Sequence, residues 1–312
     1  MIDISHKDPT LRTATAAAEV FMAPATVEII RRREAPKGDV LEVAKATAVQ
    51  AVKNTSTIIP YCHPISITGV DVGFDLRDDG VRIEVTVRAI DRTGVEVEAM
   101  TGASIAALVV YDMLKMVDET LSIGKVELVE KRGGKSDFRR GVLTGLKAAV
   151  LVLSDAIAAG RKQDLSGLLI RDRLEAEGLT VADYRIISDD REGVVEQLCR
   201  YADHDRYELV ITTGGTGFGS RDFVPEAMND VLEREAPGLA EAMRVHGQDR
   251  TPLSMLSRAR AGIRGPTLII NLPGSLGGVT DALDALFPGL IHAFGMLRDE
   301  PHDHDPRPEG GE

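Results

Sequence analysis

The sequence predicts two domains of different class: an α+β domain, followed by an α/β domain with a doubly wound, mostly parallel sheet. A chain of 312 residues is long enough for two domains of ordinary size. Alternating apolar and polar residues around a tight turn dominate the first half, as in antiparallel sheets. In the second half, apolar strands alternate with helical segments, which is typical of a doubly wound sheet.

The first half is expected to form one antiparallel sheet with helices on one face. Strands are expected at 25–32, 70–76, 81–90, 95–98 and 121–129, and Asp78-Asp79-Gly80 forms a hairpin turn. Asp39 is a plausible N-cap for a helix that runs to about Asn54. A second helix, from about Thr101 to Glu119, is apolar on nearly every side, and we therefore expect it to be buried nearly all round.

The second half is expected to alternate strands with helices. Its strands are 148–154, 180–188, 207–213 and 267–272, and its helices are 165–177, 190–203 and 225–235, with further helices at the C-terminus. Ligands of such a sheet bind at the carboxyl ends of its strands. We place the first domain at 1–138, a glycine-rich linker at 139–146, the second domain at 147–299 and a disordered tail at 300–312.

Composition and charge exclude several classes of protein. Residues 1–140 carry 19 Lys and Arg against 21 Asp and Glu, whereas residues 141–312 carry 18 against 28. The acidic second half disfavours a nucleic-acid partner. The apolar runs are too short for a membrane span and the first residues lack a signal-peptide pattern, so we expect a cytoplasmic protein without membrane contact. Cys62 and Cys199 are the only cysteines, which excludes a disulfide framework and a CxxC metal site.

Charged residues in the expected apolar helix and beside it mark a candidate site in the first half. Asp112 and Lys115 lie one turn apart and form either a solvent-exposed ion pair or a buried acid–base couple with tuned pKa values. Glu96 and Glu98 alternate on the expected strand 95–98, so both carboxylates face one side, which is either a solvent face or part of the site.

Two loops contribute further candidates. His63 follows Cys62 between two prolines that stiffen the backbone, and it is either a structural histidine or a site residue. Lys37 precedes a helix N-terminus, where the amide dipoles already attract anions; an ordinary solvated turn is the alternative.

These residues belong to a longer pattern in the first half. The matching runs are Met1–Ser5, Thr10–Ala14, Lys37–Val40, Ile59–Pro64, Thr93–Thr101, Tyr111–Lys115 and Gly133–Ser136. On these runs the first half resembles the MoaC family, the cyclic pyranopterin monophosphate synthases of molybdenum cofactor biosynthesis. Tyr61 stands where an aliphatic residue is usual and Leu114 where the family often has cysteine, and neither position is charged.

The resemblance implies a ferredoxin-like fold, assembled as a homo-hexamer with sites between subunits. It implies that a cyclised GTP derivative, a dihydroguanosine triphosphate, is rearranged to cyclic pyranopterin monophosphate with release of pyrophosphate, and that no cofactor is required. The catalytic residues it implies are Asp112, Lys115, Lys37 and His63, and the substrate-binding residues are Arg12, Tyr61, Cys62, His63, Glu96, Val97, Glu98 and Lys135. Such acids and bases can move the protons of the rearrangement, and the cations can neutralise a triphosphate.

A glycine-rich loop marks a second candidate site at the end of the expected strand 207–213. In Thr212–Gly217, backbone amides without obstructing side chains can surround an oxyanion, and a plain tight turn is the alternative. The glycine spacing is that of neither a dinucleotide fold nor a P-loop. Polar residues at the ends of neighbouring strands are expected to converge on this loop, although each Asp among them could be only a helix cap. The candidates are Asp155, Ser166, Asp189, Gly214, Gly215, Thr216, Gly217, Asp222, Pro273, Gly274 and Ser275.

Residues 146–298 resemble the molybdopterin-binding domain shared by the MoaB and MogA families, most specifically at Thr212–Gly217 and Arg221–Asp222. The resemblance implies transfer of AMP from Mg-ATP to the phosphate of molybdopterin, with Asp189 and Asp222 holding the Mg²⁺. The lysine that often follows the Pro-Gly motif is missing, because Leu276-Gly277-Gly278 stands there.

We therefore expect a bifunctional enzyme whose partners are molybdopterin and other enzymes of the pathway. The main alternative is a second domain that is a non-catalytic scaffold, which binds the pterin and oligomerises. A regulator that binds nucleotides without turnover is disfavoured by the acid–base set around Asp112. A different nucleotide cyclohydrolase would need a metal cluster, which Cys62 and His63 alone do not make.

Overall fold

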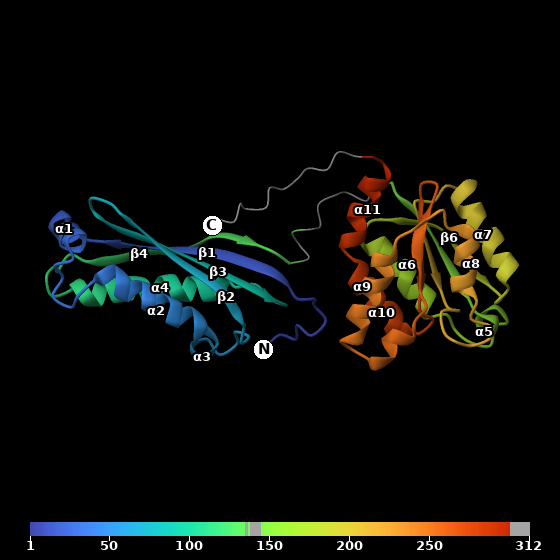
Figure 1. The fold of residues 1–312 in the computed structure, drawn as a ribbon, viewed down its shortest axis with the longest axis horizontal. Coiled ribbons are helices and arrows are strands. Elements are labelled where there is room, and N and C mark those ends of the chain that lie inside the picture. The colour runs from blue at the N-terminus through green and yellow to red at the C-terminus, as the bar shows by residue number, and fades with distance from the viewer. Residues whose placement is uncertain (135–136, 138–144, 300–312) are drawn as a thin grey trace. The chain divides into compact units, whose positions relative to one another are not determined.

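The chain forms two compact units, Met1–Asp137 and Phe138–Glu312 (Figure 1). The computed structural model describes residues 1–134, 137 and 145–299. Lys135, most of the expected linker 139–146 and the expected tail 300–312 lie outside the described residues.

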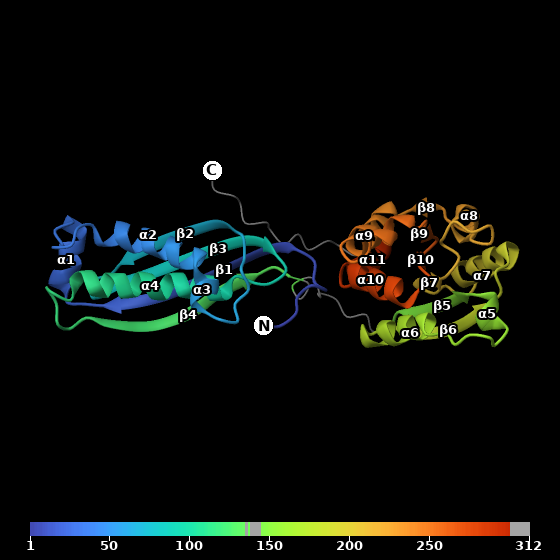
Figure 2. The same ribbon diagram turned by 90° about the horizontal axis from the view of Figure 1, so that it is seen from below.

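The first unit is an antiparallel sheet with helices on one face, as predicted (Figure 2). Its strands pair in the order β2-β3-β1-β4. The strands are β1 (Thr10–Phe21), β2 (Ile67–Leu76), β3 (Gly80–Asp91) and β4 (Ser122–Arg132), and the helices are α1 (Pro24–Arg32), α2 (Val40–Lys53), α3 (Thr55–Ile58) and α4 (Glu96–Leu114). Small residues allow α2 and α4 to pack closely, because a side chain at Gly102 would lie 2.7 Å from Val52.

Two expected strands of the first unit are wrong. Residues 25–32 form α1, in which Pro24 lies in the first turn and the buried Thr26, Val27 and Ile30 follow helical spacing. Residues 95–98 belong to the start of α4, where the acidic first turn complements the helix dipole. The expected helix end at Glu119 is also wrong, since α4 ends at Leu114.

Strand β1 was not predicted, although it lies between β3 and β4 in the sheet. Its inward residues, Ala14, Ala16, Ala18 and Val20, are buried and alternate along the strand. Most of them are alanine, which is a strong helix former. The residue types therefore hide the alternation of buried and exposed residues that indicates a strand.

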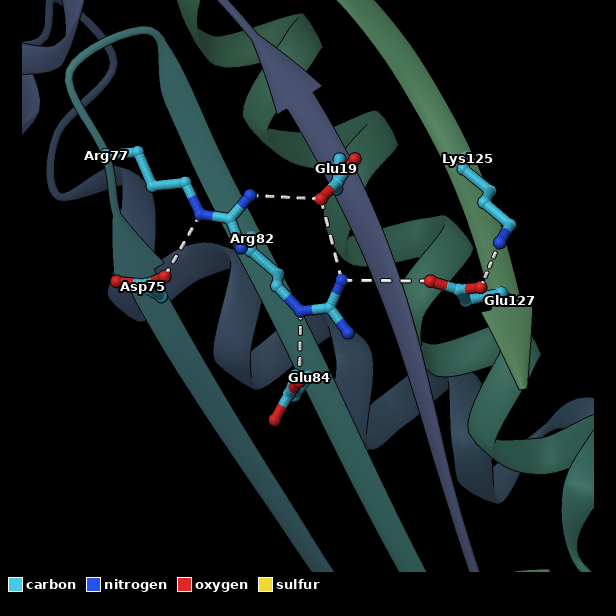
Figure 3. A network of polar contacts seen from close by, with 7 residues as sticks. All are labelled: Glu19, Asp75, Arg77, Arg82, Glu84, Lys125 and Glu127. Carbon is cyan, nitrogen blue, oxygen red and sulfur yellow. Dashed lines mark hydrogen bonds and ion pairs between the residues drawn. The ribbon is translucent and has the colours of Figure 1, made fainter. Parts of the chain in front are cut away.

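The opposite face of the sheet carries a network of charged side chains (Figure 3). Arg82 lies 3.0 Å from Glu84, 3.5 Å from Glu19 and 3.8 Å from Glu127. Arg77 reaches Glu19 as well, at 3.1 Å. Such a face stays hydrated, and pairs of this kind contribute little to stability.

Helix α4 is the central helix of the first unit. Among the described residues, it is the one helix long and apolar enough to cross a membrane by length and composition alone, but half of it is buried in the fold, as in the core helix of a domain. The expectation that the helix is buried nearly all round is wrong, because Leu108 and Tyr111 are exposed.

The second unit has a six-stranded sheet with helices on both faces, which confirms the predicted α/β class. The strand order is β6-β5-β7-β10-β9-β8; the first four are parallel, and β9 pairs antiparallel with β10 and β8. Its strands are β5 (Lys147–Leu153), β6 (Thr180–Ile187), β7 (Leu209–Thr213), β8 (Arg234–Glu235), β9 (Ala261–Arg264) and β10 (Thr267–Leu272). Its helices are α5 (Asp155–Ala158), α6 (Ser166–Ala176), α7 (Arg191–Asp203), α8 (Val224–Val231), α9 (Pro237–Gln248), the 3-10 helix η2 (Pro252–Leu256), α10 (Leu276–Leu286) and α11 (Gly289–Leu297).

The helices of the second unit divide between two apolar clusters, one on each face of the sheet. Helices α6, α9, α10 and α11 contribute to one cluster, and α7 and α8 to the other. Helix 225–235 was predicted too long, because the chain leaves α8 at Val231 and forms β8; α5, α9, η2, β8 and β9 were not predicted. The carboxyl ends of β5, β7 and β10 meet at one edge, where the loops described below lie.

Candidate active sites

Asp112 holds two lysines at the C-terminal end of α4. Its carboxylate lies 2.7 Å from Lys37 Nζ and 2.8 Å from Lys115 Nζ, and Lys37 also donates to the Asp112 backbone carbonyl at 2.9 Å. The side chains of Asp112 and Lys115 are each 52% exposed. Within one chain, this pair reaches solvent at the end of the helix.

The two lysines keep Asp112 ionised. Hydrogen bonds from Lys115 and then Lys37 lower the pKa of Asp112 to about 2, and the carboxylate in turn raises the pKa of Lys115. Asp112 is therefore ionised and Lys115 protonated near neutral pH, and the cluster sets two basic side chains against one carboxylate. Two ammonium groups fixed on one carboxylate suit an anionic ligand such as a phosphate.

A second group of predicted residues surrounds the buried Glu98 at the other end of α4. Glu98 is 2% exposed, accepts a hydrogen bond from the Cys62 thiol at 3.1 Å, and leaves Oε2 without a hydrogen-bond partner among the described residues. Burial raises the pKa of Glu98; burial and then the Glu98 contact raise the pKa of Cys62 to about 12. Glu98 is thereby disposed to hold a proton.

Other predicted residues lie around this end of the domain without joining one cluster. His63 Nε2 lies 2.9 Å from the Ile2 carbonyl. Arg12 donates to two backbone carbonyls, those of Asp91 and Arg92. Tyr61 and Val97 are exposed.

The expectation that Glu96 and Glu98 face the same side is wrong. They are two residues apart on a helix rather than a strand, so they point in nearly opposite directions. Glu98 points into the core and Glu96 pairs with Lys131 at 3.1 Å.

The residues of the predicted site form two groups at opposite ends of α4. Glu98 lies in the first turn of that helix and Asp112 in its last. The axial rise over this stretch is about 21 Å. One chain therefore does not bring the Asp112 cluster and the Glu98 cluster into a single site.

In the second unit, the glycine loop follows β7 with backbone that only glycine adopts easily. Gly214 has φ +107° and Gly215 φ +63°. A Cβ on Gly214 would lie 2.4 Å from the Leu153 carbonyl oxygen at the end of β5. The glycines thus allow a close approach between two strand ends, which a plain tight turn does not require.

The Pro273–Ser275 loop is tied to the glycine loop and to α6. Thr213 Oγ1 donates to the Pro273 carbonyl at 2.7 Å, and Ser166 Oγ donates to the Gly274 carbonyl at 3.1 Å. Ser275 caps α10 by accepting from the Gly278 amide. These contacts bring the predicted loops together at one edge, and Thr216 of the glycine loop is buried.

The acidic residues at this edge are already engaged. Asp155 accepts from the Asp189 amide at 3.1 Å and pairs with Arg221 at 3.0 Å. Burial raises the pKa of Asp189, and the Asp222 carboxylate closes its own turn by accepting from the Gly219 amide at 2.8 Å.

Among the described residues, no group of three or more His, Cys, Asp or Glu is placed to hold a metal ion. Two carboxylates fit only Mg²⁺ that arrives with phosphate ligands, since Mg²⁺ is often held by one or two carboxylates and substrate phosphates. The backbone amide of Asp189 donates to the Asp155 carboxylate, which makes these two aspartates neighbours at this edge.

Two further features were missed. Arg258 braces the glycine loop by donating to the carbonyls of Gly217, at 2.7 Å, and of Asp222. A pocket of about 440 Å³ lies beside the Pro273 loop, between α9, η2 and α10. No local sequence pattern predicts either feature. Arg258 lies in a segment where the sequence predicted no helix or strand, and the pocket is formed by segments that are far apart in the sequence.

Comparison with known proteins assigns both halves of the chain. Residues 1–134 match the MoaC family and residues 149–292 match the probable molybdopterin binding domain. A molybdenum cofactor biosynthesis bifunctional protein of Chlorobaculum tepidum is 39% identical over 97% of this chain and 96% of its own length. The chain belongs to the family of bifunctional molybdenum cofactor biosynthesis proteins.

Other relatives of this bifunctional protein agree. A molybdenum cofactor biosynthesis bifunctional protein of Synechococcus elongatus is 35% identical over 97% of this chain and 98% of its own length. A cyclic pyranopterin monophosphate synthase of Pelobacter propionicus is 50% identical over 45% of this chain and 89% of its own length. Both resemblances identified in the sequence are thereby confirmed.

Proposed function

We propose that the first domain converts a cyclised dihydroguanosine triphosphate to cyclic pyranopterin monophosphate and pyrophosphate. The observation that carries this proposal is Asp112, which holds Lys37 and Lys115 side by side at 2.7 and 2.8 Å. Two such cations stabilise the charge that develops as pyrophosphate leaves. No cofactor is required for this step.

The buried Glu98 supplies the complementary chemistry. Burial raises the pKa of this carboxyl group, which favours its protonated form next to the Cys62 thiol. Rearranging a purine into a pterin requires protons to move on and off ring nitrogens, which a protonated acid can do. His63 is the second candidate for proton transfer, and Arg12, Tyr61, Glu96, Val97 and Lys135 complete the proposed substrate-binding set.

The complete site is formed by two subunits. The Asp112 end and the Glu98 end of one α4 are about 21 Å apart, so a partner subunit must bring its Glu98 end to the Asp112 end of the first. The exposed apolar side chains on α4, Leu108 and Tyr111 among them, suit such an assembly. We also propose that the complete assembly is a homo-hexamer. For the first domain we propose a ferredoxin-like fold, which the strand order β2-β3-β1-β4 supports.

Complementation between subunits tests this arrangement. Asp112→Asn and Glu98→Gln subunits are each expected to release pyrophosphate at least about 100-fold more slowly than wild type. Asp75→Asn, which removes an exposed carboxylate from another ion pair, is the control and keeps full activity. Co-assembled Asp112→Asn and Glu98→Gln subunits should regain activity at about a quarter of the sites.

Two results would count against the proposal. Near-normal turnover by Asp112→Asn removes this carboxylate from the reaction. Failure of the mixed assembly to regain any activity, when exchange of subunits has been verified, contradicts a site shared between subunits.

For the second domain we propose binding of molybdopterin and transfer of AMP to it from Mg-ATP. Glycine-loop amides next to Thr216 would hold phosphate, and Asp155 and Asp189 would hold Mg²⁺ together with the triphosphate. The metal would supply charge neutralisation on the transferred phosphate. Asp222, which closes the turn at Gly219, would keep the loop in shape and reach the metal only by giving up that bond.

A non-catalytic scaffold is the second candidate function. Two observations favour it: Arg221 already pairs with Asp155, and no lysine follows Pro273-Gly274. Isothermal titration of the full chain with Mg-ATP separates the two functions. An enzyme binds Mg-ATP and loses this binding in Asp189→Asn but not in the surface control Asp172→Asn, whereas a scaffold shows no binding.

The proposed partners are molybdopterin and other enzymes of the pathway, and the cytoplasmic location stays a prediction from the sequence.

A further inference from the structure

Arg221 reaches from the loop after β7 to the end of β5. Its Nη1 lies 3.0 Å from Asp155 Oδ2. The Arg221 side chain is 78% exposed and the Asp155 side chain 38%, so the contact is open to solvent. An exposed ion pair of this kind changes an equilibrium constant by about fivefold at most. This contact is therefore weak enough to be exchanged for a stronger one.

The backbone on which Arg221 stands is held in place. The next residue, Asp222, closes its turn by accepting from the Gly219 amide at 2.8 Å, and its backbone carbonyl accepts a hydrogen bond from Arg258. The Asp222 carboxylate fits closely against the glycines of this loop, since a Cβ at Gly217 or Gly219 would lie 2.8 Å from it. The Arg221 side chain can therefore change its partner without a change in the loop.

Asp155 cannot serve Arg221 and a metal ion at the same time. The Asp189 amide donates to Oδ1 of this carboxylate at 3.1 Å, whereas Arg221 holds Oδ2. A metal ion that joins Asp155 would therefore compete with Arg221 for Oδ2. Mg²⁺ binds oxygen at about 2.0–2.1 Å in octahedral geometry, and a guanidinium group on the same oxygen would repel it. Metal binding at Asp155 thus requires that Arg221 leave.

A phosphate that arrives with the metal offers Arg221 a better partner. Phosphate oxygens that share a metal ion with Asp155 must lie next to this carboxylate, within reach of the same guanidinium group. Arginine presents a planar fork of donors that matches phosphate. Hydrogen bonds to charged groups change an equilibrium constant by about tenfold or more, which exceeds the exposed ion pair. The exchange of carboxylate for phosphate is therefore favourable.

We propose that Arg221 is an exchangeable counterion of the second-domain site, which holds Asp155 in the ligand-free protein and moves to the triphosphate when Mg-ATP binds. This inference rests on the proposed function of the second domain. The contact between Arg221 and Asp155 then belongs to the unloaded state of an enzyme, and it does not close the site to a metal ion.

Binding of Mn²⁺ with and without ATP tests the exchange in the full-length protein. Mn²⁺ accepts the same oxygen ligands as Mg²⁺, and electron paramagnetic resonance measures its free concentration. In Arg221→Gln, Mn²⁺ alone is expected to bind about 2–5-fold more tightly than in wild type, because Arg221 no longer competes for Asp155. ATP saturated with Mn²⁺ is expected to bind at least about 10-fold more weakly, because the phosphate loses its donor.

Two further variants serve as controls. Arg171→Gln removes an exposed arginine of α6 from its ion pair with Asp172 and should leave both affinities unchanged. Arg221→Lys keeps the charge but not the fork of donors. In this variant Mn²⁺ alone should bind as in wild type, and Mn-ATP should bind with an affinity between those of wild type and Arg221→Gln.

Opposite shifts of the two affinities support the exchange. If Arg221→Gln weakens both, Arg221 only keeps the loop in shape, and if it strengthens both, Arg221 only repels the metal. Either result, like no change in either affinity, overturns the inference.

Asp189→Asn separates this outcome from failure of the proposed function. If wild type binds Mn-ATP and Asp189→Asn does not, but Arg221→Gln shows no opposite shifts, the exchange is refuted and the proposed function stands. If wild type does not bind Mn-ATP at all, both are refuted.

Discussion

Gly214→Ala tests whether the glycine loop is built by close approach of backbone. Gly214 has φ +107°, beyond the left-handed region that non-glycine residues tolerate, which extends to about +70°. The added methyl group would lie 2.4 Å from the Leu153 carbonyl oxygen, which belongs to β5 and cannot swing away like a side chain. The substitution therefore acts on backbone conformation and on strand spacing together.

The expected cost follows from these two contributions. The backbone conformation costs about 1–3 kcal/mol. Forcing the carbonyl away from the new methyl group adds about 1–3 kcal/mol, as overpacking does in cores. A total of about 4 kcal/mol, the middle of the summed range, corresponds to a loss of about 8–16 °C in the melting temperature of a domain of this size.

Scanning calorimetry of the full chain measures this loss in the transition of the second domain. Gly265→Ala is the matched control, because Gly265 has φ +51° and a Cβ added there would meet nothing within 4 Å. In the control only the left-handed backbone conformation reduces the free energy of unfolding, by about 1–2 kcal/mol. Its melting temperature should fall by about 2–4 °C for each kcal/mol lost. Equal losses in the two variants would refute the reasoning, since they would show that Leu153 accommodates the methyl group without cost.

Three further predictions concern buried charge and its partners. Asp118 accepts four hydrogen bonds, from Thr120, Ala23 and Thr26, and these bonds lower its pKa. Wild type should therefore lose stability as the pH falls below 3.8. In urea unfolding, Asp118→Asn should be less stable than wild type by about 2–4 kcal/mol at neutral pH and should lack this acid dependence. Burial raises the pKa of Glu98, so its contribution to stability is complete below pH 4.5 and is lost as the pH rises through its folded pKa. Thermal melts of Glu98→Gln should therefore show a melting temperature that depends less on pH than that of wild type. An unchanged pH profile would contradict a buried titrating group. Arg258→Lys should weaken Mg-ATP binding, measured by calorimetry, by at least about 10-fold, because lysine cannot donate to the Gly217 and Asp222 carbonyls at once. Unaltered affinity would show that these two hydrogen bonds are not needed to hold the glycine loop in place.

Local chemistry was sufficient where one segment decides the outcome. Asp39 caps α2 as predicted, by accepting from the Leu41 and Glu42 amides. The hairpin of β2 and β3 forms around Asp78-Asp79-Gly80, since its turn residues and alternation agree. The parallel strands β5, β7 and β10 were found because buried strands are continuous apolar runs.

Residues 1–134 show where local chemistry fails. The segments 25–32 and 95–98 are so short that their apolar residues fit the spacing of a strand or of a helix. Tertiary packing selected the helix in both. β1 is rich in alanine, and only its pairing with β3 and β4 determines that it is extended.

The sequence alone determined the family of each half and named the candidate residues for its chemistry, because residue type and order within Lys37–Val40, Ile59–Pro64 and Thr212–Gly217 can be read without knowledge of the fold. Tertiary structure alone decided which of them meet. It places Asp112 between two lysines, buries Glu98 away from Glu96, and separates the two groups along one rigid helix. Distances between residues remote in the chain depend on how helices and strands pack, and that information is absent from any short segment.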